Sequence, residues 1–148
     1  MAKAFEFRLE KLLEVRRAKE DAAQREFASA RQAVEVRNAV ILDLMDREDD
    51  AKSDLRELQQ GGAVDLERLR MASEFAAAVE RQLRREYETL QQLVQVEMQK
   101  QEALTQARKD VRVLERHREK ELVVYRQDLD RQERKFLDEI GGNLAKGA

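Results

Sequence analysis

The sequence predicts an all-α protein in which two long helices form an antiparallel, left-handed coiled-coil hairpin, the second helix being longer and overhanging the first. Three observations predict this fold: a seven-residue apolar repeat, a single internal break with two adjacent glycines, and the absence of proline from all 148 residues. Charged residues make up 41% of the chain and aromatic residues 5%, a composition typical of coiled coils. We therefore expect one coiled-coil hairpin over residues 1–148, whose function resides on its surface and at its ends.

The first helix is predicted over about residues 5–59. Its repeat runs from Leu9 to Leu58 without a change of phase, and 11 of its 15 seam positions are apolar. The a positions are Leu13, Glu20, Phe27, Val34, Ile41, Glu48 and Leu55, and the d positions are Leu9, Arg16, Ala23, Ala30, Arg37, Leu44, Ala51 and Leu58. Alternating spacings of three and four residues keep one narrow stripe against a partner helix.

The break between the helices predicts a turn over residues 60–64. Gly61 and Gly62 are expected to end the first helix, because glycine adopts the left-handed conformation common at helix C-termini. Asp65 is suited to cap the N-terminus of the next helix with its carboxylate. Such a short connection between long helices favours an antiparallel hairpin.

The second helix is predicted over about residues 65–140. From Leu69 to Leu114 the same repeat continues, and 11 of its 14 seam positions are apolar. Beyond it the apolar register shifts by four residues, a stutter that unwinds a supercoil locally. The shifted stripe consists of Leu122, Tyr125, Leu129, Gln132 and Phe136. This overhanging end is either a frayed tail or a helix face for a partner's groove, and residues 141–148, which begin with two glycines, are expected to form a flexible tail.

Seven seam positions are charged, which lowers stability and fixes the register of pairing. They are Arg16, Glu20, Arg37, Glu48, Glu86, Glu97 and Lys100. Antiparallel pairing about the turn places Glu20 opposite Lys100 and brings Arg37 within reach of Glu86.

The N-terminal stretch is unusually apolar. Its large apolar residues occupy more than one helix face, and they are Phe5, Phe7, Leu9, Leu12 and Leu13. Phe5 and Phe7 staple the helix start, cover the stutter region, or form part of a docking end.

Charge is distributed unevenly along the chain. Residues 43–80 carry 11 acidic and five basic residues, whereas residues 3–19 carry six basic and three acidic ones and residues 108–126 seven basic and four acidic ones. In a hairpin the two basic stretches lie side by side at the open end. This asymmetry is either a chance feature of a solvated surface or the mark of a docking end.

Composition argues against several other classes of function. The chain has no cysteine, one histidine (His117), which we expect on a helix surface, and no arrangement of side chains suited to catalysis. We therefore expect no enzyme activity, no cofactor and no metal. The net charge of −2 argues against nucleic-acid binding, and the absence of an apolar leader or a long apolar run predicts a cytoplasmic protein.

Both ends of the sequence resemble the FliJ family of flagellar export proteins. The resemblance rests on FEFRLEKLLEVRR, which begins at Phe5, and on YRQDLDRQERKFLDEI, which runs from Tyr125 to Ile140. It implies a non-enzymatic part of the type III export apparatus, monomeric in isolation, cytoplasmic and associated peripherally with the inner membrane. It further implies a central stalk that enters the hexameric export ATPase (FliI-like), promotes its assembly and activity, and contacts the export gate FlhA and export chaperones.

The resemblance also implies which residues bind the ATPase ring. They are Phe5, Phe7, Leu9, Leu12, Leu13, Arg16, Arg17, Tyr125, Leu129, Arg131, Glu133, Phe136 and Ile140. Contact with the gate is expected on exposed residues in the N-terminal half of the first helix. The alternatives are a homodimeric coiled-coil scaffold without a ring partner and the equivalent stalk of an injectisome.

Overall fold

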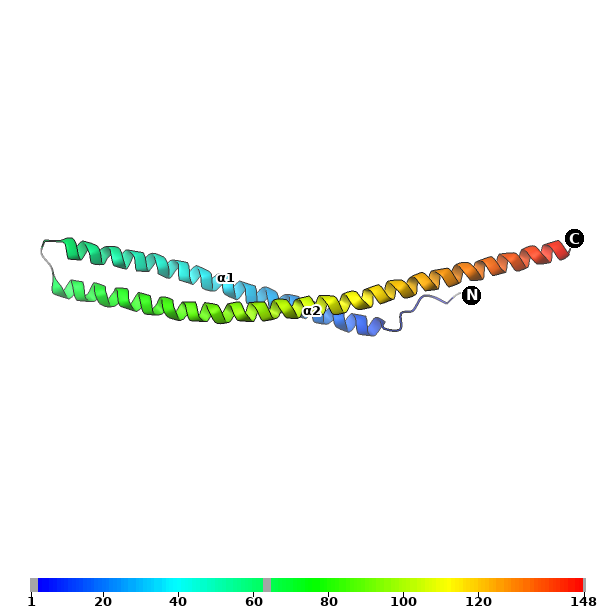
Figure 1. Cartoon of the computed structure of the whole chain (residues 1–148), viewed down its shortest axis with the longest axis horizontal. Coiled ribbons are helices and arrows are strands. Elements are labelled where there is room, and N and C mark those ends of the chain that lie inside the picture. The colour runs from blue at the N-terminus through cyan, green and yellow to red at the C-terminus, as the bar shows by residue number, and fades with distance from the viewer. Residues whose placement is uncertain (1–2, 63–64, 148) are drawn as a thin grey trace. The chain divides into compact units, whose positions relative to one another are not determined.

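The computed structural model describes residues 3–62 and 65–147 and confirms the all-α helical hairpin. Helix α1 spans Glu10–Gln60, helix α2 spans Leu66–Lys146, and the two pack against each other (Figure 1). Their contacts divide the chain into two units. We call Ala23–Ala103, which contains the turn, the hairpin unit, and Met1–Ala22 with Leu104–Ala148 the terminal unit.

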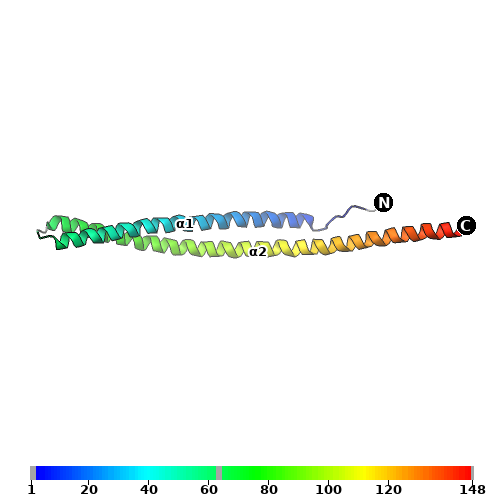
Figure 2. The same ribbon diagram turned by 90° about the horizontal axis from the view of Figure 1, so that it is seen from above.

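The predicted seam is confirmed in both units. Every a and d position from Leu9 to Leu58 and from Leu69 to Leu114 is buried or half-buried. In the hairpin unit, where α1 and α2 lie alongside each other (Figure 2), the most buried cluster consists of Ile41, Leu44, Val79 and Leu83. In the terminal unit it consists of Phe7, Leu13, Val111 and Leu114. The left-handed supercoil stays a prediction.

Asp65 caps α2 as predicted. Its Oδ1 accepts the backbone N–H groups of Glu67 at 3.1 Å and Arg68 at 3.4 Å, which satisfies two of the donors left free at a helix start. The cap defines where the second helix begins, and residues 63–64 of the predicted turn lie outside the described residues.

The prediction that Gly61 and Gly62 end α1 by adopting the left-handed conformation is wrong. The helix ends at Gln60, close to the expected position, but neither Gly61 nor Gly62 has a positive φ. The Gly61 N–H instead donates to the Glu57 carbonyl at 3.0 Å, which prolongs the helical bonding pattern by one residue. Glycine weakens a helix through its backbone entropy even where it does not adopt the left-handed conformation.

One predicted pair of charged seam residues is confirmed and the other is corrected. Arg37 Nη1 donates to Glu86 Oε2 at 2.5 Å. Lys100 Nζ donates to Glu26 Oε2 at 3.0 Å rather than to Glu20. The reason is the reach of lysine: its apolar stem lies along the seam while its ammonium group extends toward water and an acid at the seam's edge.

Glu48, also a seam position, pairs within its own helix. Its carboxylate accepts a hydrogen bond from Lys52 Nζ at 2.8 Å, and this hydrogen bond and the charge of Glu48 raise the pKa of Lys52. Because both residues lie on α1, this pair does not favour one register between the two helices over another.

Helix α1 begins at Glu10, five residues later than predicted. The preceding stretch Lys3–Leu9, which we call the strap, is non-helical. Phe5, Phe7 and Leu9 are buried or half-buried, while the intervening Glu6 and Arg8 are exposed. The stretch has no regular structure up to Phe7 and forms a turn at Arg8 and Leu9, where the Glu10 N–H donates to the Phe7 carbonyl at 3.1 Å. This explains why these residues did not fit one helix face.

Helix α2 continues to Lys146, beyond the predicted end at about residue 140, so residues 141–146 belong to the helix. The flexibility of the tail stays a prediction. Gly141 and Gly142 are helical, with no positive φ, and the Gly147 N–H donates to the Asn143 carbonyl at 3.0 Å. A glycine inside a helix costs about 1 kcal/mol relative to alanine, which weakens the helix without breaking it. Lys146 lies in the last turn, where a cation interacts favourably with the helix dipole.

Within the described residues, neither helix contains a stretch with the length and apolar character needed to cross a membrane.

Candidate docking site in the terminal unit

The strap is anchored to α2 by Phe7. This side chain is 7% exposed and belongs to the cluster that contains Leu13, which is fully buried, together with Val111 and Leu114. The rings of Phe7 and His117 also pack in a T-shaped arrangement, with their centroids 5.8 Å apart. Phe7 therefore fills the space between the N-terminal end of α1 and the side of α2 that carries Val111 and Leu114.

Phe5 extends the same contact toward the C-terminal end of α2. Its ring lies 5.5 Å from that of Tyr125, and the guanidinium of Arg118 lies over it at 5.6 Å, a distance typical of a cation–π contact. The Tyr125 hydroxyl donates to the Lys3 carbonyl. The strap thus covers α2 from Leu114 to Tyr125.

Ion pairs and hydrogen bonds join the start of α1 to α2. Arg16 Nη1 donates to the Asp110 carbonyl at 3.1 Å, and Arg17 Nη2 lies 3.4 Å from Glu115 Oε1. A further pair joins Glu10 to Arg118 at 3.2 Å. These pairs are partly exposed, so each contributes modestly to stability, but together they align the two segments.

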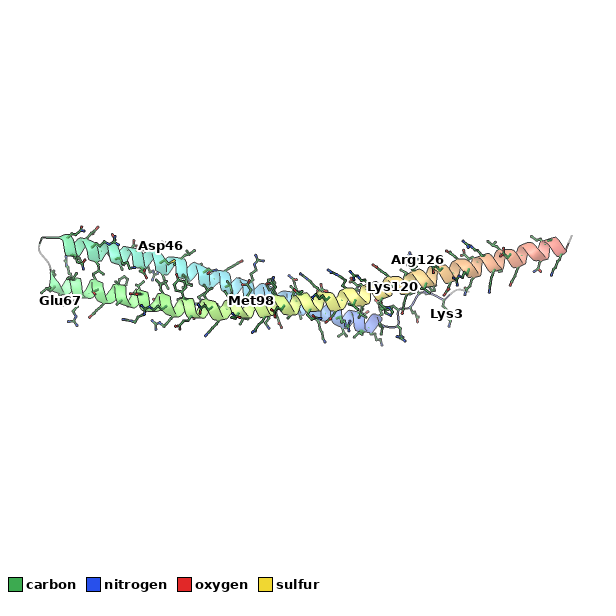
Figure 3. All side chains as sticks on the ribbon, viewed as in Figure 1. Lys3, Asp46, Glu67, Met98, Lys120 and Arg126 are labelled. Carbon is green, nitrogen blue, oxygen red and sulfur yellow. The ribbon has the colours of Figure 1, made fainter. Side chains whose placement is uncertain are left out.

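An open groove of about 990 Å³ lies between the strap and α2. Its lining includes Lys3 and Lys120, which Figure 3 labels, and the apolar side chains of Phe5, Val124 and Tyr125. His117, also on the groove, is exposed as predicted, and its Nε2 lies 3.2 Å from Glu121 Oε1. No group of side chains suited to hold a metal ion occurs among residues 3–62 and 65–147.

Beyond the strap, one face of α2 is uncovered. Every described residue from 130 to 147 is exposed, including four large apolar ones. They are Phe136 (63% exposed), Leu137 (65%), Ile140 (40%) and Leu144 (71%). At about 100° per residue they lie within an arc of roughly 100°, on the side of the helix that carries Tyr125 and Leu129. We call these four residues the α2 end face.

The predicted stutter stripe thus has two parts. Leu122, Tyr125 and Leu129 are half-buried, whereas Gln132 and Phe136 are exposed. The strap reaches this covered part at Tyr125, which Phe5 and the Lys3 carbonyl contact.

The structure distributes the residues implied for ring binding into three groups. Phe7 and Leu13 are buried, whereas Phe5, Leu9, Arg16, Tyr125 and Leu129 are half-buried. The exposed group consists of Leu12, Arg17, Arg131, Glu133, Phe136 and Ile140. The strap and the ion pairs bring the residues from α1 and those from α2 up to Tyr125 together. The residues from 131 to 140 stand apart on exposed helix.

Sequence reasoning missed Leu137 and Leu144 on this face. Leu144 follows Phe136 and Ile140 at steps of four, which is a visible helical signal. It was missed because Gly141 and Gly142 were expected to end the helix. Arg118 was missed as well, because its contact with Phe5 depends on a non-helical strap.

Comparison with known proteins supports the resemblance. The model of the family described as "Flagellar FliJ protein" matches residues 5–147, nearly the whole chain. No curated protein and no solved structure matches the chain. The matched region contains the strap, both helices and the α2 end face, so the chain belongs to the FliJ family of flagellar proteins and is related to flagellar export.

Proposed function

We propose that this protein is the non-enzymatic central stalk of the flagellar export ATPase. In this proposal the terminal unit enters the hexameric ring and promotes its assembly and activity, and other exposed surfaces link the ring to the export gate and to substrate chaperones. Family membership supports a role in flagellar export. The stalk role rests on one observation: the uncovered apolar α2 end face.

The α2 end face has the properties of a helix that docks into a groove. Phe136, Ile140 and Leu144 recur at four-residue steps, so they present a single stripe. Large apolar side chains grouped on an exposed helix mark an interaction surface more often than a purely solvated one. The expected partner surface is therefore an apolar groove in the ring.

The two parts of the terminal unit have different roles in this proposal. Leu13 and Phe7 present almost no surface, so they hold the start of α1 and the strap against α2. Leu12, Arg17 and the α2 end face remain accessible for contact with the ring.

A single asymmetric stalk in a symmetric ring contacts the six subunits unequally. It therefore binds some conformational states of a subunit better than others, and that difference in affinity shifts the equilibrium among those states. A stalk of this kind needs no active site of its own to change the rate of hydrolysis.

The test is titration of the protein into its cognate export ATPase, with hexamer formation and ATP hydrolysis as readouts. Hexamer formation and ATP hydrolysis should both rise when the unaltered chain is added. The affinity of the Phe136→Ser/Ile140→Ser variant for the ATPase should be about tenfold lower. The matched control is Met71→Ser/Phe75→Ser in the hairpin unit, where the side chains are 65% and 56% exposed. If neither assembly nor hydrolysis responds to the unaltered chain, the proposal is wrong.

A further inference from the structure

The outward side of α2 in the terminal unit carries a second surface, made of basic residues and valines. At about 100° per residue, seven side chains fall within an arc of roughly 120° opposite the seam residues Val111 and Leu114. They are Lys109, Arg112, Val113, Arg116, Lys120, Val123 and Val124. No acid lies within this arc between residues 105 and 127, and Glu119 lies just beyond its edge. We call these seven residues the basic–valine face.

The four cations of this face have no partner among the described residues. Nearby charges on the other sides of α2 do: Glu115 pairs with Arg17, Arg118 with Glu10, and His117 lies against Glu121. Lys109, Arg112, Arg116 and Lys120 take part in none of the ion pairs or hydrogen bonds that the described residues make. None of the four positive charges is therefore held in an ion pair with a described residue, and each can interact with a partner.

The valines distinguish this face from an ordinary solvated surface. Val113, Val123 and Val124 are 62%, 51% and 54% exposed. Valine is a weaker helix former than the lysine, glutamate and alanine that usually fill exposed helix positions, so local stability does not account for three of them here. Lys109, Arg116 and Lys120 lie along the middle of the arc, and the valines lie to either side of them. A row of unpaired cations flanked by exposed apolar side chains is suited to bind a partner of complementary charge.

We propose that the basic–valine face binds a carboxylate-rich surface inside the ATPase ring, so that the ring contacts α2 on its outward side as well as on the α2 end face. This inference rests on the proposed stalk function. The partner chemistry is aspartate or glutamate side chains flanked by small apolar ones. An anionic membrane fits less well, because interfacial helices insert tryptophan, phenylalanine or leucine, which this face lacks.

The experiment uses the full chain and compares two triple variants of equal charge change. Arg112→Gln/Arg116→Gln/Lys120→Gln removes three cations from the face. Its control removes three exposed helical arginines of the hairpin unit that make no side-chain ion pair with described residues. The control variant is Arg56→Gln/Arg81→Gln/Arg85→Gln.

Binding to the cognate ATPase is measured from about 50 to about 300 mM NaCl, with thermal melting to verify that each variant is folded. We expect the face variant to bind about tenfold more weakly at low salt and to show a shallower salt dependence, with the control within about twofold of the unaltered chain. Val113→Ser/Val124→Ser should also weaken binding, but without changing the salt dependence.

Each outcome of this experiment supports or overturns a specific claim. Equal affinities of the two triple variants for the ATPase would show that the basic–valine face does not bind the ring, without contradicting the stalk function. No binding by the unaltered chain overturns both. A parallel measurement uses phosphatidylglycerol vesicles: if only vesicle binding, and not ring binding, depends on the three cations, the face is a lipid surface and the proposal is wrong.

Discussion

Phenylalanine has different roles at two positions of the terminal unit. Phe7 is 7% exposed within an apolar cluster, whereas Phe136 is 63% exposed. We predict that Phe7→Ala lowers the local free energy of opening around residues 111–125 by about 2–3 kcal/mol, because it leaves a cavity under the strap. Phe136→Ala should change it by less than about 0.5 kcal/mol. Hydrogen exchange of the α2 amides measures both, and equal effects would contradict the assignment of Phe7 as an anchor.

The Arg37–Glu86 pair is predicted to fix register at the expense of stability. The two side chains are 33% and 17% exposed, and the buried Nε of Arg37 has no hydrogen-bond partner among the described residues. Arg37→Leu alone should destabilise the protein by about 1–2 kcal/mol, because it leaves the Glu86 carboxylate partly buried without its cation.

Replacing both partners provides the control. The double variant Arg37→Leu/Glu86→Leu should be at least as stable as the unaltered chain, because a continuous apolar layer replaces a desolvated ion pair. Thermal unfolding followed by circular dichroism distinguishes the variants. A double variant less stable than the unaltered chain would contradict this prediction and show that the pair is favourable overall.

The sequence predicted this pair but not the partner of Lys100. Arg37 and Glu86 both occupy seam positions, so antiparallel register alone brings them together. Lys100 has a long flexible side chain, and its pairing with Glu26 depends on side-chain geometry. Spacing patterns carry no information of that kind.

At the scale of elements, the heptads predicted the seam because burial in a helix pair depends only on spacing. The strap was not predicted, although Phe5-Glu6-Phe7-Arg8-Leu9 alternates strictly between apolar and charged residues. This stretch was interpreted with helical periodicity because the heptads directly follow it. The available signal was that the spacing of apolar residues changes at Glu10, from every second residue to the helical period of 3.6 residues.

The end of α2 provides a prediction at this scale. Apart from the glycine itself, its chain neighbours and the adjoining helix backbone, no described heavy atom lies within 4 Å of a Cβ built at Gly141 or Gly142, and neither φ is positive. Gly141→Ala/Gly142→Ala should therefore stabilise the last helical turns by about 1 kcal/mol per residue. Hydrogen exchange of amides 139–146 should slow accordingly. Faster exchange in the double variant would show that these glycines adopt another conformation in solution.

At the scale of the whole molecule, family membership could be predicted from the sequence because both terminal motifs lie within the matched residues. The exposure of the residues implied for ring binding could not be predicted, because it depends on how the strap covers α2. Spacing alone places Phe7 and Phe136 equally well on a docking surface, and only the packed structure separates them.

Binding to the ring should stabilise the whole chain by mass action. With the ring at 100 times its dissociation constant, the free energy of unfolding should rise by about 2.7 kcal/mol, because the ring binds the folded chain and not the unfolded one. The measurement is thermal unfolding of the labelled protein at increasing ring concentrations. A melting temperature independent of ring concentration would contradict specific binding.

The most direct test of the stalk function is photocrosslinking from two matched aromatic positions. Benzoylphenylalanine replaces Phe136 on the α2 end face in one variant and Phe75 in the hairpin unit in the other; the native side chains are 63% and 56% exposed. On irradiation with the cognate export ATPase under hexamer-forming conditions, position 136 should crosslink to the ATPase and position 75 should not. A crosslink from position 75 with none from position 136 would contradict insertion of the terminal unit.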